Sequence, residues 1–140
     1  MKVYRITHSI NFILIILLSS CDTNDSYFDN RLKVVNNSQN SIYADFYQSY
    51  PDTSLSLLFH FSSDQHKINP GGRISLGRGG DWETAFKDDI NQKLIILIFD
   101  GNTIETVPWD TIRKKYLVLK RYDLTLDSLK KLNWVVTYPN

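Results

Sequence analysis

The chain has 140 residues, of which 16 are Lys or Arg and 15 are Asp or Glu, so its formal net charge is +1. This balance excludes the strongly basic surface typical of nucleic-acid binding, and the length suits one domain with a hydrophobic core rather than two. A single cysteine excludes an internal disulfide and a cysteine-rich metal centre.

The N-terminal segment predicts export followed by lipid attachment. Lys2 and Arg5 give a cationic start, and the apolar run at residues 10–18 is too short for a membrane span, which takes roughly 20 residues. The run ends in Leu18-Ser19-Ser20-Cys21, which resembles the lipobox of bacterial lipoproteins. The resemblance implies that residues 1–20 are a signal peptide and that Cys21 carries the lipid, whose acyl chains would hold the protein on a bilayer. The alternative is a cysteine without modification.

The mature chain would begin with a short tether. Residues 21–30 are polar and show no hydrophobic period, which is typical of a flexible linker, and we expect the single globular domain to span residues 31–140. Removal of the signal peptide takes away two basic residues, which leaves 14 basic against 15 acidic residues. With Cys21 acylated, no thiol remains for a disulfide, a metal site or catalysis.

Hydrophobic patterns predict strands in the N-terminal half of the domain. Residues 31–35 and 41–48 flank a polar cluster and together predict a β-hairpin. Apolar side chains at every second position of residues 55–61 predict a half-buried strand, and residues 73–76 predict another. The glycines on either side of that last strand are typical of turns.

The second half of the domain mixes helices with strands. Asp81 is placed to cap a helix with one apolar face, formed by Trp82, Ala85, Phe86 and Ile90. Residues 94–99 are apolar at every position and predict a central strand covered on both faces.

After the central strand the chain is expected to turn and alternate once more. Asp100-Gly101 predicts a turn into a strand at residues 103–107. Pro108 predicts the start of a helix whose buried side is formed by Trp109, Ile112 and Tyr116. The remaining elements are a strand at residues 117–122, a helix at residues 125–132 capped by Thr125, the left-handed residue Asn133, and a closing strand at residues 134–138.

Together these elements predict a mainly β or α+β fold. We expect an antiparallel, sandwich-like sheet structure with two or three short helices in the C-terminal half. A pure β-sandwich is the alternative, because the helical patterns are short.

The sequence also resembles a family of small uncharacterised lipoproteins from Bacteroides and its relatives. The likeness rests on residues 119–139 (LKRYDLTLDSLKKLNWVVTYP), Ile98-Phe99-Asp100 and Pro108-Trp109, with a weaker match at Ser49-Tyr50-Pro51-Asp52. It implies an outer-membrane lipoprotein of a Gram-negative envelope, on the periplasmic face or at the cell surface, and it implies no catalytic residue. In such bacteria an acidic stretch after the lipidated cysteine can mark lipoproteins for the surface, and the dispersed Asp22, Asp25 and Asp29 match it loosely.

No residue pattern predicts catalysis or a cofactor. Residues 70–80 (PGGRISLGRGG) have the glycine spacing of a phosphate loop, but Arg78-Gly79 stands where Lys and Ser or Thr are needed. His60 and His66 have no third ligand at a spacing that suits zinc, and surface histidines are the simpler interpretation. Asp88-Asp89 fits the solvated side of a helix better than an acid–base pair. We therefore expect no catalytic residue, no cofactor and no metal.

The sequence favours a membrane-anchored envelope lipoprotein with a non-catalytic binding or interaction domain. Its partners would be the membrane, through Cys21, and an envelope protein or glycan, with no nucleic acid. One alternative is an envelope hydrolase or accessory enzyme with scattered active-site residues, which a cavity with converging polar groups of perturbed pKa would favour. The other is a purely structural envelope lipoprotein, which a flat surface would favour.

Overall fold

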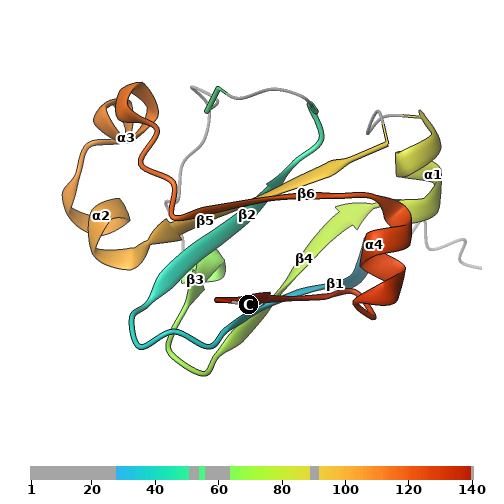
Figure 1. Cartoon of the computed structure of the whole chain (residues 1–140), viewed down its shortest axis with the longest axis horizontal. Coiled ribbons are helices and arrows are strands. Elements are labelled where there is room, and N and C mark those ends of the chain that lie inside the picture. Colours follow the sequence, from blue (N-terminus) through green and yellow to red (C-terminus); the bar gives the residue numbers. More distant parts are fainter. Residues whose placement is uncertain (1–27, 51–53, 56–63, 89–91, 140) are drawn as a thin grey trace, which may run out of the picture.

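The computed structural model describes residues 28–50, 54–55, 64–88 and 92–139, which form two β-sheets and several short helices (Figure 1). The strands are β1 (Phe28–Asn36), β2 (Ile42–Tyr47), β3 (Lys67–Ile68), β4 (Arg73–Gly79), β5 (Leu94–Asp100), β6 (Lys120–Leu124) and β7 (Val135–Tyr138). The helices are the 3-10 turn η1 (Asp64–His66), α1 (Trp82–Asp88), α2 (Gly101–Thr106), α3 (Trp109–Lys115) and α4 (Leu126–Lys131). The expected mainly β, sandwich-like α+β fold is confirmed.

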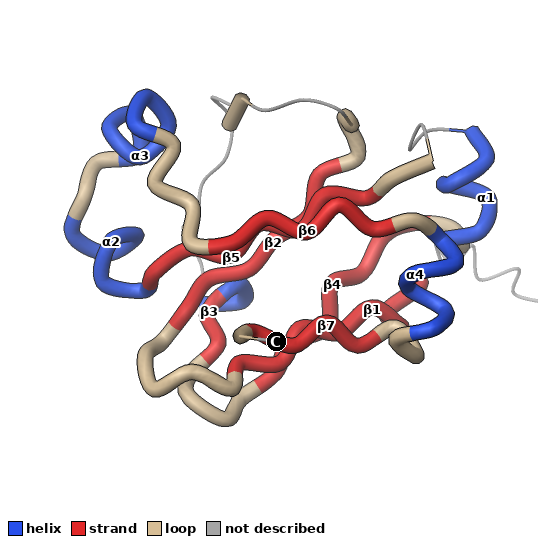
Figure 2. The backbone as a smooth tube through the Cα atoms, in the orientation of Figure 1, coloured by secondary structure: helices blue, strands red, loops and turns tan. Residues whose placement is uncertain are grey.

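The strands divide between two sheets that face each other (Figure 2). The first sheet has the order β4-β1-β7 and the second has the order β3-β2-β5-β6. Neighbouring strands are antiparallel apart from β1 and β7, which run parallel. Because β7 pairs only with β1 among the described strands, it forms one edge of the first sheet.

The main hydrophobic core fills the space between the two sheets. Alternate residues of each strand point inward, as the period of two in a strand requires, so Leu32 and Val34 of β1 meet Ile42 and Ala44 of β2. Helices α1 and α4 close one end of this core, and Trp82 of α1 is fully buried there.

A second cluster covers the outer face of the second sheet. Strand β5 is buried on both faces: Leu94, Ile96 and Ile98 belong to the main core, whereas Ile95 and Leu97 pack in the outer cluster with residues of α2 and α3. The continuous apolar run at residues 94–99 is therefore explained by two layers of cover, as predicted.

The predicted hairpin at residues 31–48 is wrong in its pairing. Both strands exist, but β1 and β2 belong to different sheets. The connection crosses between the sheets, and the buried side chain of Asn36 holds it by donating hydrogen bonds to the backbone oxygens of Asn40 and Ile68 at 2.8 and 2.9 Å. Strand patterns predict which residues are extended but not the neighbour with which each strand pairs.

The predicted strand at residues 103–107 is also wrong, because α2 occupies this position. Asp100 caps the helix by accepting a hydrogen bond from the backbone N–H of Thr103 at 2.8 Å. Gly101 lies so close to the β1–β2 connection that a Cβ atom there would come within 2.6 Å of the Ser41 carbonyl oxygen. Capping and this close approach override the strand propensity of Thr103, Ile104 and Val107.

The other C-terminal predictions are largely confirmed. Asp81 and Thr125 cap α1 and α4 through hydrogen bonds from the backbone N–H groups of Thr84 and Ser128. Asn133 has a left-handed φ of 50° before β7. Helix α3 follows Pro108 and buries Ile112, but Tyr116, expected on its buried side, is exposed.

Several boundaries differ from expectation. Strand β1 begins at Phe28, three residues before the expected start of the domain, and β4 continues to Gly79, so two glycines expected in turns lie in a strand. Most of the predicted strand at residues 55–61 lies outside the described residues, as do residues 1–27 with Cys21.

Candidate functional site

The strongest candidate site is a cavity where the open edges of the two sheets approach each other. Its volume is about 250 Å³, and it lies between β2 with the adjoining η1 on one side and β4 on the other. The lining residues are Asp45, Phe46, Gln65, His66, Ser75, Leu76 and Gly77.

The cavity lies beyond the short strand β3. β3 pairs with β2 only at Ile42 and Tyr43, so within the described residues the next part of β2 has no strand on that side. There the turn η1 brings His66 against β2, where its Nδ1 lies 3.2 Å from the carbonyl oxygen of Ala44. Among the described residues, an imidazole is thus the partner of this part of the strand.

Asp45 reaches this place through strand alternation. Its neighbours Ala44 and Phe46 point into the main core, so Asp45 points to the opposite face, where Leu97 is its cross-strand partner. Only 7% of the residue is exposed. Its Oδ1 accepts a hydrogen bond of 2.6 Å from the backbone N–H of Phe46, and its Oδ2 lies 3.5 Å from Nδ1 of His66.

The contacts of His66 define its tautomer. A carbonyl oxygen can only accept a hydrogen bond, so the Nδ1 atom that meets Ala44 carries the hydrogen. In the neutral ring Nε2 is then the atom with the lone pair. A histidine oriented in this way by a backbone carbonyl and a carboxylate resembles the oriented imidazoles of binding and catalytic sites.

Burial has a marked effect on Asp45. Desolvation raises the pKa of the Asp45 carboxyl from 3.8 to about 6, although the Phe46 N–H and the charge of His66 both act to lower it. A carboxyl group that titrates close to neutrality, inside a cavity and beside a histidine, is a candidate for a functional residue.

The cavity offers hydrogen-bond acceptors to a small group. The Asp45 carboxylate and the His66 imidazole can accept hydrogen bonds from amines or hydroxyls. The volume is below the roughly 300–1,000 Å³ typical of drug-sized ligand sites, so the cavity admits one small group at a time.

A more open hollow lies beside α2. It measures about 430 Å³ and is lined by Asn40, Ser41, Lys67, Asp100, Gly101, Asn102 and Glu105. Its Lys67 and Glu105 are already paired, because Lys67 Nζ lies 2.6 Å from Glu105 Oε1, which also accepts a hydrogen bond from the Tyr43 hydroxyl at 3.2 Å. Its Asp100 carboxylate is engaged as the cap of α2. This hollow is therefore a weaker candidate than the Asp45 cavity.

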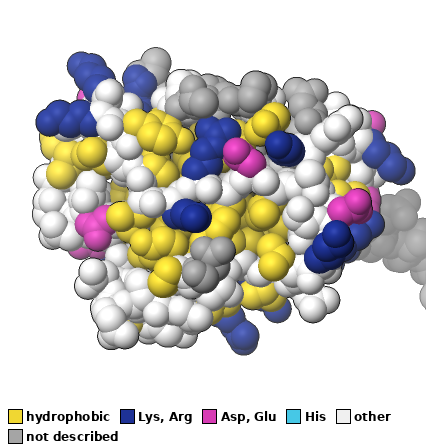
Figure 3. Space-filling model, in the orientation of Figure 1, with side chains coloured by type: hydrophobic (Ala, Val, Ile, Leu, Met, Phe, Trp, Pro, Cys, Tyr) yellow, Lys and Arg dark blue, Asp and Glu magenta, His cyan; other side chains and the backbone are white. Residues whose placement is uncertain are grey.

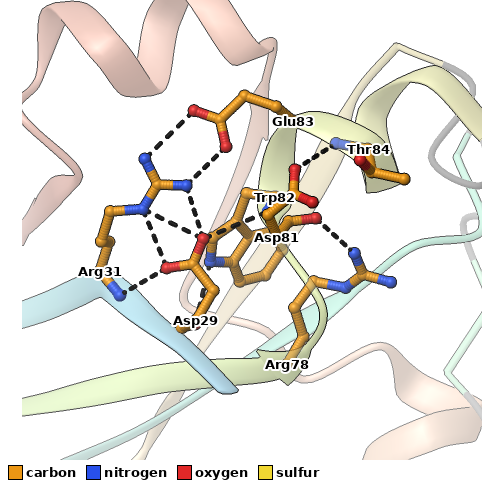
Figure 4. A network of polar contacts seen from close by, with 7 residues as sticks. All are labelled: Asp29, Arg31, Arg78, Asp81, Trp82, Glu83 and Thr84. Atoms are coloured by element: carbon orange, nitrogen blue, oxygen red, sulfur yellow. Dashed lines mark hydrogen bonds and ion pairs between the residues drawn. The ribbon is translucent and has the colours of Figure 1, made fainter. Parts of the chain in front are cut away.

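A separate polar network around Asp29 is structural (Figure 4). The buried Asp29 carboxylate accepts hydrogen bonds from the Arg31 side chain and from the backbone N–H of Trp82, while its backbone oxygen accepts one from the Trp82 ring at 3.2 Å. Arg31 also contacts Glu83 of α1, and its guanidinium lies 4.4 Å from the centre of the Trp134 ring.

This network fixes the start of β1 against α1. The hydrogen bond and charge of Arg31 hold the pKa of Asp29 below its usual value, the opposite direction to Asp45. Asp29, expected in the acidic tether, is thus 2% exposed and belongs to the folded domain. Asp29 therefore does not belong to the acidic stretch that was expected after Cys21.

The sequence-based candidates lie partly elsewhere. His66 is less exposed than expected, with 29% of its side chain accessible, and it contacts Asp45. Asp88 is exposed at the end of α1, while His60 and Asp89 lie outside the described residues. Asp45 and Ser75 were not identified from the sequence. The only signal for Asp45 was one carboxylate among the apolar and aromatic residues of the run IYADFY.

Comparison with known proteins gives no relative. No protein-family model, curated protein or solved structure matches the chain. Among the described residues, no helix has the length and apolar character needed to span a membrane, and no three His, Cys, Asp or Glu side chains group as metal ligands.

Proposed function

We propose that the protein is a lipid-anchored lipoprotein of a Gram-negative envelope, held on the outer membrane through Cys21. The order of a cationic start, an apolar run, two small residues and a cysteine supports the anchor. The resemblance of residues 119–139 to lipoproteins of Bacteroides and its relatives supports the same location.

The anchor has a direct test. In a host that lipidates proteins, radiolabelled fatty acid should be incorporated into the parent chain and not into a Cys21→Ser variant, which should leave the processed membrane-bound pool. A matched Ser20→Ala variant keeps a small residue before the cysteine and should still be acylated. Fatty acid incorporated into Cys21→Ser would refute the anchor.

The domain carried by this anchor is a non-catalytic binding module, and the Asp45 cavity is its ligand site. The observation that carries this proposal is a buried carboxylate and an oriented imidazole lining one cavity of about 250 Å³. The acceptors and the small volume suit a single amine- or hydroxyl-bearing group, such as one sugar residue of an envelope glycan or one basic side chain of an envelope protein.

Binding is tested with the purified parent chain and two variants that change only the acceptors. Amino sugars, neutral sugars and lysine- or arginine-containing peptides are titrated into the parent, Asp45→Asn and His66→Gln, followed by calorimetry. We expect one of these classes to bind the parent and to bind both variants at least 10-fold more weakly, because a buried unpaired donor is costly. Equal affinity for the parent and Asp45→Asn would remove the cavity as the site.

A hydrolase is the second candidate function, because a histidine beside a buried carboxyl group of raised pKa is also an arrangement found in catalytic sites. His66 and Asp45 have the side-chain chemistry of a base and an orienting acid. Ser75 supplies no nucleophile to this pair, because its neighbours Ile74 and Leu76 face the core and its own side chain is exposed on the other face of β4. A fluorophosphonate probe distinguishes the two functions. Covalent labelling of the parent that Asp45→Asn and His66→Gln both abolish would favour the hydrolase, whereas ligand binding without labelling favours the binding module.

A further inference from the structure

A second surface of the molecule has the chemistry of a docking site. Residues 114–120 (KKYLVLK), which we call the Lys114–Lys120 surface, lead from the end of α3 into β6. Three large hydrophobic residues are exposed in this short run, namely Tyr116 (39%), Leu117 (36%) and Leu119 (47%). Figure 3 shows basic side chains beside hydrophobic ones at the end of the molecule where α3 lies.

The backbone presents these side chains in a fixed arrangement. The N–H groups of Tyr116 and Leu117 donate hydrogen bonds to the carbonyl oxygens of Arg113 and Ile112, which closes α3. Further along, the Leu119 N–H donates to the Ile98 carbonyl oxygen at 2.8 Å, which ties the run to β5. The exposure of the hydrophobic side chains therefore does not come from a loose loop.

Tyr116 occupies a backbone position that favours glycine. It ends α3 in the left-handed conformation, with φ 49° and ψ 54°. Glycine adopts this conformation without the steric cost that a Cβ atom brings. The exposed side chain of Tyr116, which forms a hydrogen bond with Arg121, thus occupies a position where glycine would fit the backbone with less strain.

The charged side chains of the Lys114–Lys120 surface are all positive. The run holds Lys114, Lys115 and Lys120, all exposed, and no acidic residue. Residues 101–140 as a whole contain 7 basic and 4 acidic residues. Exposed leucines and a tyrosine flanked on both sides by lysines match the chemistry of a membrane interface, where aromatic rings lie at headgroup level and lysines reach the phosphates.

We infer that the Lys114–Lys120 surface docks on the phosphate headgroups of an anionic lipid bilayer. The choice of a bilayer over an acidic protein rests on the proposed anchor at Cys21. The seven residues from Cys21 to the start of β1 span at most about 25 Å when extended. Because β1 begins at the end of the molecule opposite α3 (Figure 1), docking lays the long axis along the membrane.

The test places a fluorescent probe on this surface in the full chain. The chain is produced in a lipidating host and reconstituted into vesicles of phosphatidylethanolamine with or without phosphatidylglycerol. Cys21 is the sole cysteine of the sequence, so a polarity-sensitive dye on Leu117→Cys labels one position when Cys21 is acylated. The same dye on Gln39→Cys, in the exposed connection between β1 and β2, is the matched control.

We expect the dye at position 117 to shift to shorter wavelength and to be quenched by spin-labelled lipid, in phosphatidylglycerol vesicles only. The dye at position 39 should do neither. Replacing Lys114, Lys115 and Lys120 with Gln should abolish both effects. Tyr116→Gly should reduce them, and because glycine relieves the backbone at this position, its loss of docking would not come from unfolding.

Docking and anchoring fail in different ways in this experiment. A dye at position 117 that stays in water beside phosphatidylglycerol, or that responds to a soluble acidic protein and not to vesicles, overturns the docking surface. If mass spectrometry finds a second dye on Cys21, that thiol was not acylated and the anchor is absent. In that case the dyes at positions 117 and 39 are compared again in a Cys21→Ser background, which still decides whether the surface docks.

Discussion

The pKa of Asp45 makes a quantitative prediction about stability. In the folded protein burial raises this pKa from 3.8 to about 6, so the folded state binds the Asp45 proton more tightly than the unfolded state does. The stabilisation by this proton is fully present below pH 4 and is lost as the pH rises toward 6. At 1.36 kcal/mol per pH unit, the loss amounts to about 3 kcal/mol.

Asp45→Asn should remove this part of the pH dependence. The amide keeps nearly the same shape and carries no charge, so its burial does not become more costly as the pH rises. Relative to the parent, the variant should gain about 3 kcal/mol in free energy of unfolding between pH 4 and 7. The absolute value at pH 7 also includes altered hydrogen bonds to Phe46 and His66, so the slope is the decisive quantity.

The assay is urea denaturation of the parent and Asp45→Asn at half-unit steps from pH 4 to 7.5. Asp88→Asn, at an exposed carboxylate, is the control and should follow the parent curve within about 0.5 kcal/mol. His66→Gln should extend the loss of stability to higher pH, because the charge of His66 helps to lower the pKa of Asp45. If the free energies of unfolding of the parent and Asp45→Asn run parallel with pH, burial does not raise the pKa of the Asp45 carboxyl group.

Four further substitutions and one deletion test the fold. Asp29→Ala should lower the free energy of unfolding by about 2–3 kcal/mol in urea denaturation at pH 7, because the buried N–H of Trp82 and the half-exposed guanidinium of Arg31 lose a charged acceptor. An unchanged midpoint would contradict a structural role. Trp134→Ala should lower the free energy of unfolding by about 3 kcal/mol, because the centre of its ring lies 6.4 Å from that of Trp82. Deletion of residues 133–140 should abolish the cooperative unfolding transition, because this segment contains β7 and completes the first sheet. Gly101→Ala should lower the free energy of unfolding by about 1–3 kcal/mol, because its Cβ atom would meet a backbone oxygen at 2.6 Å. Gly79→Ala, whose Cβ atom would meet nothing within 4 Å, should be nearly neutral in the same urea denaturation series.

The sequence predicted most elements because their signals are local. The caps at Asp81 and Thr125 act within three residues, and the double-sided burial of β5 shows directly as an unbroken apolar run. The same local signals failed at α2, where one cap and one close contact with Ser41 outweighed several β-branched residues. That contact joins residues 60 positions apart and leaves no trace in the local pattern.

The candidate site escaped prediction for a related reason. Asp45, His66 and Ser75 lie on three separate elements, and each sits in a stretch that looks like an ordinary strand or loop. They line one cavity at the point where η1 leads into the two-residue strand β3 and where, among the described residues, no strand pairs with β2 beyond Tyr43. Strand pairing across the two sheets decides this, and the wrong hairpin assignment of β1 and β2 shows that pairing was the information the sequence lacked.

Two carboxylates are buried among the described residues, and their pKa values shift in opposite directions. Asp29 is held by Arg31 and by the backbone of α1, its pKa is lowered, and its charge therefore stabilises the fold. Asp45 has its pKa raised, so its charge opposes folding at neutral pH by about 3 kcal/mol in a domain whose total stability is typically about 5–15 kcal/mol. An uncharged side chain of the same size would avoid that cost. Packing does not explain a carboxylate there, whereas the proposed ligand site, in a cavity and beside an oriented histidine, gives it a role.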